Sequence, residues 1–547
     1  MKNRFLTRVM SNIDARSETT FSVIVGKDFT HEMKWSDLAA DARRFSGLLR
    51  ANGLRRGDQL LIFLEFGPRL YGAFLGAMMT GVVPSFMPTL TNRQNPDLFW
   101  KSHDQLLRQV RPAGILASSR VFDEMREAGL NRGASRDIRL EDLPASDPGE
   151  PDFPGEEDIA LLQHSSGTTG LKKGVALSYA AITRQLDSYG SALNLEPDDK
   201  IVSWLPLYHD MGLVACFLLP LYRGLSIRHI DPQHWVSRPN TLFDALHATR
   251  RTFTWMPNFA FEHLAATVRR QAERYDLSGV EAFINCSEPC KTLSFDRFLE
   301  AFGPAGERPE QLQCCYAMAE TTFAAAQTPL GAPPRRVRVD RERLAMGQRP
   351  LDPNGATEVV ESGRALEGVE IEIFDENRAK VADGIVGEIG LSGDFLFTEY
   401  NAEPERTRAQ LQDGIYYSRD LGFRHEGCLY VLGRKDDVII VNGRKLFAHE
   451  VEEALTRIVG IRPGRAVAAS LPSERTGTGE LVIIAERDPA APRDEAAIRG
   501  DVVTTVFSIF AVQPKAVALR EPGSLVKTTS GKISRGVNLA RYLAEQV

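Results

Sequence analysis

Hydrophobic and polar positions along the first 150 residues alternate between two spacings. Apolar residues recur at helical spacing over residues 35–52, whereas residues 59–64 form a short apolar run suited to a buried strand. The same alternation resumes over residues 159–331, with a predicted helix at 239–250 and a predicted strand at 282–286. Such an alternation is typical of an α/β layered fold.

A change of spacing after residue 369 marks a second kind of region. Short alternating runs broken by turns, at residues 369–374, 387–392 and 427–432, predict a β-rich subdomain. A polar, proline-rich stretch at residues 144–157 is a connection between the first two α/β regions. We predict an N-terminal body at residues 1–434, with its β-rich part at about 340–432, and a small C-terminal α/β domain at residues 435–547.

Composition narrows the classes of protein that fit this pattern. A chain of 547 residues with 43% hydrophobic content can bury a large core in more than one domain. Its 66 basic and 72 acidic residues are interspersed, so no basic stripe offers itself to nucleic acid. The 6 cysteines are too sparse for a disulfide scaffold, and the most apolar run, at residues 213–222, is about half a membrane span. We therefore expect a cytoplasmic protein without a membrane span.

A glycine-, hydroxyl- and lysine-rich stretch, S-S-G-T-T-G-L-K-K-G at residues 165–174, lies between two apolar runs. Glycines let the backbone approach a ligand, hydroxyls and amides donate to phosphate oxygens, and a lysine neutralises their charge. The stretch differs from the common P-loop, and a polar hairpin without a ligand is the alternative. The candidate phosphate-binding residues are Ser165, Ser166, Gly167, Thr168, Thr169, Gly170 and Lys173.

Six further stretches follow in a fixed order along the chain. They read W-L-P-L-Y-H-D-M-G at 204–212, N-C-S-E-P at 285–289, Y-A-M-A-E-T at 316–321, S-R-D-L-G at 418–422, G-R-K-D-D at 433–437 and K-T-T-S-G-K-I at 527–533. Together with the phosphate loop, they resemble the motifs of the adenylate-forming superfamily, which includes acyl-CoA synthetases, fatty-acyl-AMP ligases, peptide-synthetase adenylation domains and luciferases. The resemblance covers nearly the whole chain. It implies an enzyme that uses ATP and Mg²⁺ to convert a carboxylic acid to its acyl-AMP and then passes the acyl group to a thiol.

The resemblance also implies roles for the nucleotide-binding residues. Glu320 would bind Mg²⁺ together with Thr168, which suits the preference of that ion for hard oxygen ligands. Asp420 would hold both ribose hydroxyls, and Arg434 would contact the ribose or phosphate. The residues expected to line the adenine site are Ser287, Glu288, Pro289, Tyr316, Ala317, Met318 and Thr321. A surface or helix-capping carboxylate is the alternative for Glu320.

The remaining expected roles concern catalysis, the acyl group and domain motion. Lys532 would enter the site during adenylation, where positive charge stabilises the transition state of attack on the α-phosphorus. Asp436 would be the hinge of a mobile C-terminal domain, and His209 would gate the acyl pocket. That pocket is expected to include Tyr208, Met256, Asn258, Phe259 and Cys286. The alternatives are a surface charge cluster for the hinge and a flexible tail for the lysine.

Details around His209 and Asn258 favour the fatty-acyl-AMP ligases, which deliver acyl groups to the phosphopantetheine thiol of a carrier protein. That branch carries an extra segment in its β-rich region, and residues 407–422 look short for it. Free CoA as the acceptor, a luciferase-like oxidoreductase and a non-catalytic acyl- or nucleotide-binding relative remain as alternatives. This chain also departs from the superfamily pattern at Lys172, Cys286, Ala317 and Arg419.

Overall fold

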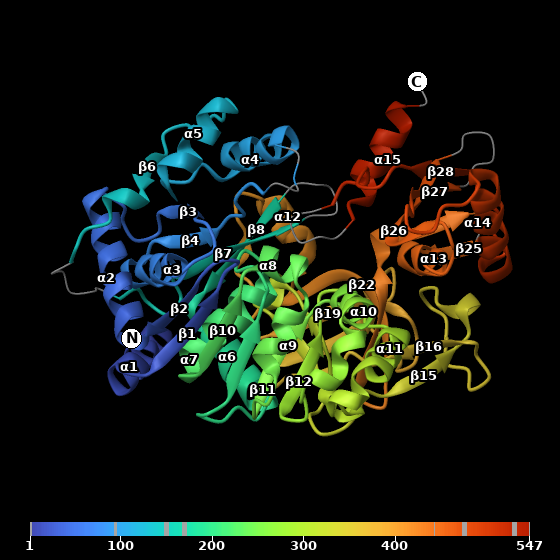
Figure 1. The fold of residues 1–547 in the computed structure, drawn as a ribbon, viewed down its shortest axis with the longest axis horizontal. Coiled ribbons are helices and arrows are strands. Elements are labelled where there is room, and N and C mark those ends of the chain that lie inside the picture. Colours follow the sequence, from blue (N-terminus) through green and yellow to red (C-terminus); the bar gives the residue numbers. More distant parts are fainter. Residues whose placement is uncertain are drawn as a thin grey trace.

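The structure is a computed structural model that describes residues 3–91, 94, 96–146, 153–166, 172–441, 444–472, 479–527 and 533–545. Figure 1 shows the ribbon, with the last elements gathered on one side of a larger body. The predicted α/β fold class, with a β-rich part and a small C-terminal α/β part, is confirmed.

The largest sheet of the body has nine strands in the order β17-β14-β13-β12-β11-β9-β10-β1-β2. Its central neighbours are parallel, whereas β2, β14 and β17 add antiparallel edges. These strands are β1 (Thr20–Val25), β2 (Thr30–Lys34), β9 (Lys200–Ser203), β10 (Ser226–Ile230), β11 (Thr252–Met256), β12 (Val280–Asn285), β13 (Leu312–Ala317), β14 (Ala324–Gln327) and β17 (Arg364–Ala365). Because parallel strands in the middle of a sheet are covered on both faces, every residue of β11 and all but one of β12 are buried.

Two smaller sheets flank the largest one. A parallel sheet has the order β4-β3-β5-β6, and a three-stranded sheet has the order β20-β8-β7. Their strands are β3 (Gln59–Phe63), β4 (Val83–Phe86), β5 (Gly114–Ala117), β6 (Arg136–Arg139), β7 (Ile159–Ser166), β8 (Lys172–Ser178) and β20 (Glu399–Tyr400). The antiparallel pair β7 and β8 carries the phosphate-loop motif at its tip.

Helices cover these sheets and pack closely where small residues allow it. Helix α3 (Arg69–Thr80) approaches α2 (Trp35–Ala51) at Gly76, where an added Cβ would lie 2.5 Å from the carbonyl oxygen of Ala42. The close approach therefore requires glycine. The other helices of the body are α1 (Arg4–Arg16), α4 (Pro96–Val110), α5 (Ser119–Glu127), α6 (Tyr179–Ala192), α7 (Leu219–Arg223), α8 (Pro232–Ser237), α9 (Asn240–Leu246), α10 (Asn258–Thr267), α11 (Thr292–Phe302) and α12 (Pro404–Gln410).

The β-rich part of the body consists of a five-stranded antiparallel sheet and a separate hairpin. The sheet has the order β18-β19-β22-β21, β23 pairs with the later part of β22 on the same side as β21, and the hairpin pairs β15 with β16. The strands are β15 (Arg336–Val339), β16 (Thr357–Val360), β18 (Val369–Phe374), β19 (Gly387–Gly393), β21 (Leu411–Gln412), β22 (Ile415–His425) and β23 (Cys428–Arg434).

A short turn, Lys435–Asp437, joins β23 to the elements that we call the C-terminal unit. This unit has its own apolar core, formed by residues such as Val451, Ile483 and Val502. Its elements are β24 (Val438–Val441), β25 (Arg444–Phe447), α13 (Ala448–Leu455), β26 (Ile461–Pro472), β27 (Gly479–Arg487), α14 (Glu495–Phe510), β28 (Ala516–Arg520) and α15 (Arg535–Ala544).

Most predicted elements lie where the spacing of apolar residues put them. The helix expected at 35–52 is α2, and the strands expected at 59–64, 369–374 and 387–392 are β3, β18 and β19. The helix expected at 239–250 is shorter, because α9 ends at Leu246 and the chain turns at Ala248, whose φ is 54°. No helix in the described part of the chain is both long and apolar enough to cross a membrane.

Candidate active site

The phosphate-loop motif lies at the tip of the β7–β8 hairpin, where Ser165 pairs with Lys173 and Ser166 with Lys172. Gly167, Thr168, Thr169 and Gly170 lie outside the described residues, as do the side chains of both serines. The side chain of Lys173 is described. Its position at the start of β8 aims its ammonium into the body.

A buried polar cluster surrounds this ammonium. Lys173 forms an ion pair with Glu320, whose side chain is 5% exposed. The hydroxyl of Tyr400 donates to the same carboxylate over 2.8 Å, and the Lys173 ammonium lies 4.8 Å from the centre of the Tyr400 ring. Burial alone would raise the pKa of Glu320, but the charge of Lys173 and these hydrogen bonds hold it below its ordinary value. Glu320 is therefore ionised, and its carboxylate can bind a cation.

The backbone around Glu320 explains how a carboxylate becomes buried at this point. Strand β13 ends at Ala317, and a single turn at Ala319–Thr321 follows it. The Thr321 hydroxyl bonds to the carbonyls of Met318 and Phe323, at 3.1 and 2.8 Å. These bonds lie within the turn, so the Thr321 hydroxyl and the Met318 carbonyl stabilise its shape.

A second polar cluster forms around Asp420. The phenol of Tyr316, on β13, donates to the Asp420 carboxylate over 2.7 Å, and the Arg434 guanidinium on β23 lies 3.7 Å from it. Burial raises the pKa of Asp420 above its ordinary value, while Arg434 and Tyr316 oppose the rise. An acceptor of this kind, partly shielded from water, suits two sugar hydroxyls.

Asp420 points inward because β22 carries a bulge. Glu388 of β19 pairs with Leu421 and Gly390 pairs with Tyr417, so the three residues 418–420 face one residue, Ile389. The Ser418 hydroxyl holds the bulge by donating to the Ile389 carbonyl over 2.7 Å. Bulges next to active sites commonly re-aim a side chain, and this one presents Asp420.

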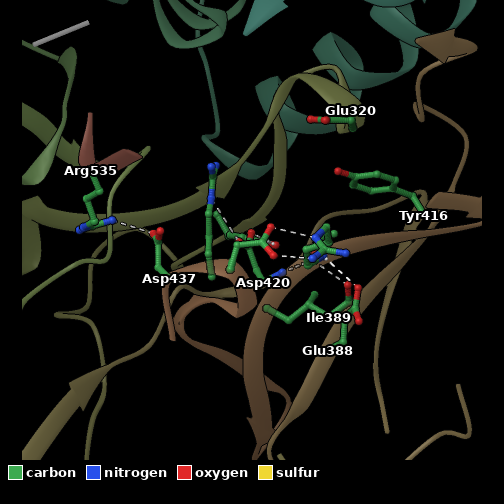
Figure 2. Close-up of polar contacts among 12 residues, drawn as sticks. Glu320, Glu388, Ile389, Tyr416, Asp420, Asp437 and Arg535 are labelled. Atoms are coloured by element: carbon green, nitrogen blue, oxygen red, sulfur yellow. Dashed lines mark hydrogen bonds and ion pairs between the residues drawn. The ribbon is translucent and has the colours of Figure 1, made fainter. Parts of the chain in front are cut away.

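The two clusters belong to one site. Glu320 and Lys173 both act on the charge of Asp420, the first raising and the second lowering its pKa. Tyr416 is close to both carboxylates: burial raises the pKa of its phenol well above the ordinary value, and Glu320 and Asp420 raise it further. Figure 2 shows Glu320, Tyr416 and Asp420 together in one close-up.

The residues expected around the adenine and acyl groups are brought together by β11, β12 and the loop after β12. Met256 pairs with Asn285, and its carbonyl accepts from the amide of Cys286 over 3.1 Å. The Glu288 carboxylate accepts from the amide of Phe259 over 3.0 Å, which holds the loop against the start of α10.

Asn258 is the centre of the polar contacts beside this loop. Its carbonyl oxygen accepts from the side chain of Asn285 over 2.9 Å and from the amide of Lys291 over 3.2 Å. Its amide group donates to the Ser294 hydroxyl over 3.0 Å. Ser287, with a φ of 69°, makes the sharp turn that the loop requires, and Pro289 follows two residues later.

The stretch around His209 lies against the phosphate hairpin. The Gln163 side chain on β7 donates to the carbonyl of Tyr208 over 3.0 Å, and the rings of Tyr208 and His209 are 4.8 Å apart. A π-helix, Met211–Leu218, begins directly afterwards. Gly212 permits this, since an added Cβ would lie 2.3 Å from the Pro206 carbonyl oxygen.

The predicted hinge residue Asp436 lies in the turn between β23 and β24 and forms an ion pair with Arg419. Lys532 lies outside the described residues, but the residue that begins its motif does not. Burial lowers the pKa of Lys527 to about 8, and the nearby charge of Glu288 opposes that change. The start of this C-terminal motif therefore lies on the same side of the body as the adenine loop.

Two residues, one in the site and one beside the turn that follows β23, were missed by the sequence patterns. Tyr400 belongs to a two-residue strand that pairs with Val175 of β8, and such a short strand has no spacing signal. Arg535 begins α15 and binds Asp437 over 2.8 Å and Glu452 over 2.7 Å, as Figure 2 shows for Asp437. Arg535 lies directly after the C-terminal motif, and this position is the signal from which the sequence could have predicted it.

The fold and these two clusters define an enzyme that binds a nucleotide and handles its phosphates. The model of the AMP-binding enzyme family matches residues 14–401. The chain therefore belongs to the AMP-binding enzyme family.

Individual relatives are similar over nearly their whole length. The long-chain-fatty-acid–AMP ligase FadD32 of Mycolicibacterium smegmatis is 30% identical, over 94% of this chain and 89% of its own. The long-chain-fatty-acid–AMP ligase FadD26 of Mycobacterium tuberculosis is 29% identical, over 95% of this chain and 93% of its own. A solved structure from work on fatty acyl-adenylate ligases of E. coli and L. pneumophila has a TM-score of 0.90 at 24% identity, over 98% of both chains, and so shares the fold.

Proposed function

We propose that the protein activates a carboxylic acid, a fatty acid or a related acid, with ATP and releases pyrophosphate. It then transfers the acyl group from acyl-AMP to the phosphopantetheine thiol of a carrier protein and releases AMP. One observation carries the proposal: the Lys173–Glu320 pair and the Asp420 cluster lie together in a chain of the AMP-binding enzyme family. The FadD32 and FadD26 relatives are AMP ligases for long-chain fatty acids, which supports the acid and the acyl-AMP product.

In the first half-reaction, a carboxylate oxygen of the acid attacks the α-phosphorus of ATP, and the bond to pyrophosphate breaks. Asp420, with Tyr316 beside it, would hold the ribose and thereby fix the α-phosphate near the acid. Lys173 would neutralise phosphate charge, and Lys532 is expected to stabilise the charge that develops at the transferring phosphorus. These groups position the substrates and neutralise phosphate charge, which is the usual means of catalysing such a transfer.

Mg²⁺ fits the donor set around Glu320. The described residues contain no group of three or more His, Cys, Asp or Glu side chains that could hold a metal alone. Mg²⁺ is commonly bound by one or two carboxylates together with substrate phosphates and water, so a single ionised Glu320 is sufficient. Bound there with ATP, the ion would offset phosphate charge.

A carrier protein as acceptor is supported by one feature of the β-rich part. The connection between β15 and β16 contacts the C-terminal unit, with Glu342 bound to Arg444 over 3.1 Å and Arg341 lying 4.9 Å from the Phe510 ring. A segment that restrains this unit is what the resemblance to fatty-acyl-AMP ligases implies, and residues 336–360 are the candidate for it. Arg444, which could otherwise attract the phosphates of CoA, is paired.

The experiment is pyrophosphate release across carboxylic acids of varied length and polarity, with acyl-AMP identified by mass spectrometry. We expect release with a subset of acids, dependent on Mg²⁺. The Lys532→Ala variant should lose acyl-AMP formation by orders of magnitude and retain thiol transfer from supplied acyl-AMP. Absence of release with every acid tested would reject the proposed function.

A further inference from the structure

The chain passes from the body to the C-terminal unit through one short turn, Lys435–Asp437, which we call the connector. Before it, Leu432 belongs to a core with Phe423 and Tyr430 of the body, to which Phe447 of β25 also contributes. After it, Ile439 belongs to the separate core of the C-terminal unit. The orientation of the two parts therefore depends on the connector and on side-chain contacts between their surfaces.

One residue of the body that faces the connector has an unusual backbone. Arg419 has a φ of 64°, in the left-handed region that glycine adopts freely and that other residues adopt at a cost. It is the central residue of the β22 bulge, between Ser418 and Asp420. A strained residue that persists is a reason to look for what its side chain does.

The Arg419 guanidinium binds the connector by two hydrogen bonds to the Asp436 carboxylate, the longer of them 2.9 Å from Nε to Oδ2. A second contact lies alongside, since the Lys435 ammonium is 3.5 Å from the Glu388 carboxylate. Glu388 also accepts from the backbone amide of Arg419 over 3.1 Å. Both charged residues that begin the connector are thus held by body residues of opposite charge.

We propose that Arg419 and Glu388 form a two-point electrostatic clamp on the connector, which holds the C-terminal unit in the orientation described here and opens when that unit rotates for thiol transfer. The part of this inference that concerns thiol transfer rests on the proposed function. Arg419 acts through Asp436 and is a positioning residue.

The orientation that the clamp holds is the one that brings the C-terminal unit to the adenine loop. Lys291, next to that loop, binds Glu453 of α13 over 2.9 Å, and Lys527 lies near Glu288. This orientation suits acyl-AMP formation. Rotation of the connector would take the Asp436 carboxylate away from Arg419, so each turnover would break and re-form the pair.

The exposure of the clamp suits a contact that must open repeatedly. The side chains of Arg419 and Asp436 are 47% and 41% exposed. Ion pairs at such sites are weak, because water screens the charges. The paired guanidinium fork gives the contact its direction, and its weakness keeps the opening fast.

Orientation can be measured without any assumption about the reaction. A zero-length carbodiimide couples an amine to a carboxylate that it touches, so the Lys291–Glu453 crosslink reports the described orientation. The Lys34–Glu18 pair, 3.0 Å apart within the body, is the internal reference. The ratio of the two crosslinked peptides is measured by mass spectrometry.

The variants are chosen for the left-handed backbone at position 419. Asn and Asp tolerate a positive φ, so Arg419→Asn removes the charge and Arg419→Asp reverses it without new strain. In Arg419→Asn the loss of ~1 kcal/mol shifts the equilibrium between orientations about fivefold, so we expect the crosslink ratio to fall, and to fall further in Arg419→Asp. The double variant Arg419→Asp, Asp436→Arg should restore it, and Arg419→Lys should retain most of it.

The half-reactions provide the second readout. With acyl-AMP supplied, thiol transfer should be faster in Arg419→Asn than in the unaltered protein, by up to about fivefold, with Arg419→Lys near the unaltered rate. A crosslink ratio that is unchanged in both Arg419→Asn and Arg419→Asp would overturn the clamp. Failure of the unaltered protein to form any acyl-AMP would instead reject the proposed function, and the crosslink ratio would still decide on the clamp.

Discussion

Asp420 and Glu320 are both buried carboxylates, yet their neighbours shift their pKa values in opposite directions. The Glu320 carboxylate touches the ammonium of Lys173 directly, and this contact outweighs burial, so its pKa is lowered. The nearest cation of Asp420 is 3.7 Å away, and burial prevails, so its pKa is raised. Glu320 is therefore suited to binding a cation, whereas Asp420 is suited to accepting hydrogen bonds from neutral hydroxyl groups.

Replacing Asp420 by Asn should weaken ATP binding by at least tenfold. Two ribose hydroxyls would lose a charged acceptor, and hydrogen bonds to charged groups contribute roughly 1.5–3 kcal/mol each. Isothermal titration calorimetry measures the affinity. Tyr316→Phe, which removes one donor to Asp420 and keeps the ring, is the matched control and should have a smaller effect. Unchanged affinity in a folded Asp420→Asn variant would remove this residue from the nucleotide site.

The burial of Glu307 should make the stability of the folded protein depend on pH. Glu307 is 6% exposed, and neither of its carboxylate oxygens has a hydrogen-bond partner among the described residues. Burial raises the pKa of Glu307 well above its ordinary value. The folded state thus keeps a proton that the unfolded state releases, so stability is full below the unfolded pKa of about 4.3 and falls as the pH rises toward the folded pKa.

The Glu307→Gln variant should remove this dependence. We expect it to be more stable than the unaltered protein near pH 8, because holding the proton on the buried carboxyl costs up to roughly 1.4 kcal/mol for each pH unit above its unfolded pKa, with a smaller gain near pH 5. Urea unfolding at both pH values measures the free energies. A gain that is equal at pH 5 and pH 8 would contradict the argument.

The sequence predicted the site residues that belong to a recognisable motif and missed those that belong to none. Asp420 and Tyr316 each belong to a recognisable motif, and the structure brings them within 2.7 Å. Tyr400 reaches Glu320 across 80 positions of the chain, and nothing in its own surroundings marks it. Long-range pairing of this kind is invisible to a single sequence.

At the scale of elements, the strands were predicted best where one face is buried. Strand β18 alternates buried and exposed residues, and its predicted bounds match those observed. The π-helix after Asp210 was not predicted, because its residues are all buried and apolar and have no period. The bulge in β22 was missed as well, since it depends on the register with β19.

Helix α15 is anchored to the rest of the C-terminal unit by its first residue, Arg535. The fork of Arg535 binds Glu452, whose pKa burial raises and Arg535 lowers. In Arg535→Ala, Glu452 would be left buried without this partner, and we expect a loss of about 2–3 kcal/mol in stability, below the range for fully buried pairs. Thermal unfolding measures it.

The control for this prediction lies on the same helix. Arg541 is exposed and contacts the Ser524 carbonyl over 3.3 Å, so Arg541→Ala should change stability by less than about 0.5 kcal/mol. Arg535→Lys keeps the charge without the planar fork and should fall between the two. Equal effects of Arg535→Ala and Arg541→Ala would show that the anchor contributes nothing.

At the scale of the whole molecule, the choice of acceptor depends on how the body and the C-terminal unit meet. The reacting arm is the same in CoA and in a carrier protein, so discrimination must come from surfaces beyond it. Arg444, one cation of that surface, is bound to Glu342 and is therefore not free for the CoA nucleotide.

We therefore expect faster thioester formation with a matched carrier protein than with free CoA at equal concentration, once the acid is known. Glu342→Ala should release Arg444 and raise the rate with CoA by a few fold, about the strength of an exposed ion pair. Glu358→Ala, on the same hairpin, is the control. Faster turnover of the unaltered protein with CoA would make it an acyl-CoA synthetase.

The position of β22 in the middle of its sheet has a practical consequence for cutting the chain into fragments. A fragment that stops at residue 401, where the family match ends, would lack β21, β22 and β23 and would leave β19 with an unpaired edge. Unpaired edges of this kind promote aggregation between chains. Such a fragment would also lose Asp420 and Arg434 together, so expression trials should keep the chain at least through β23.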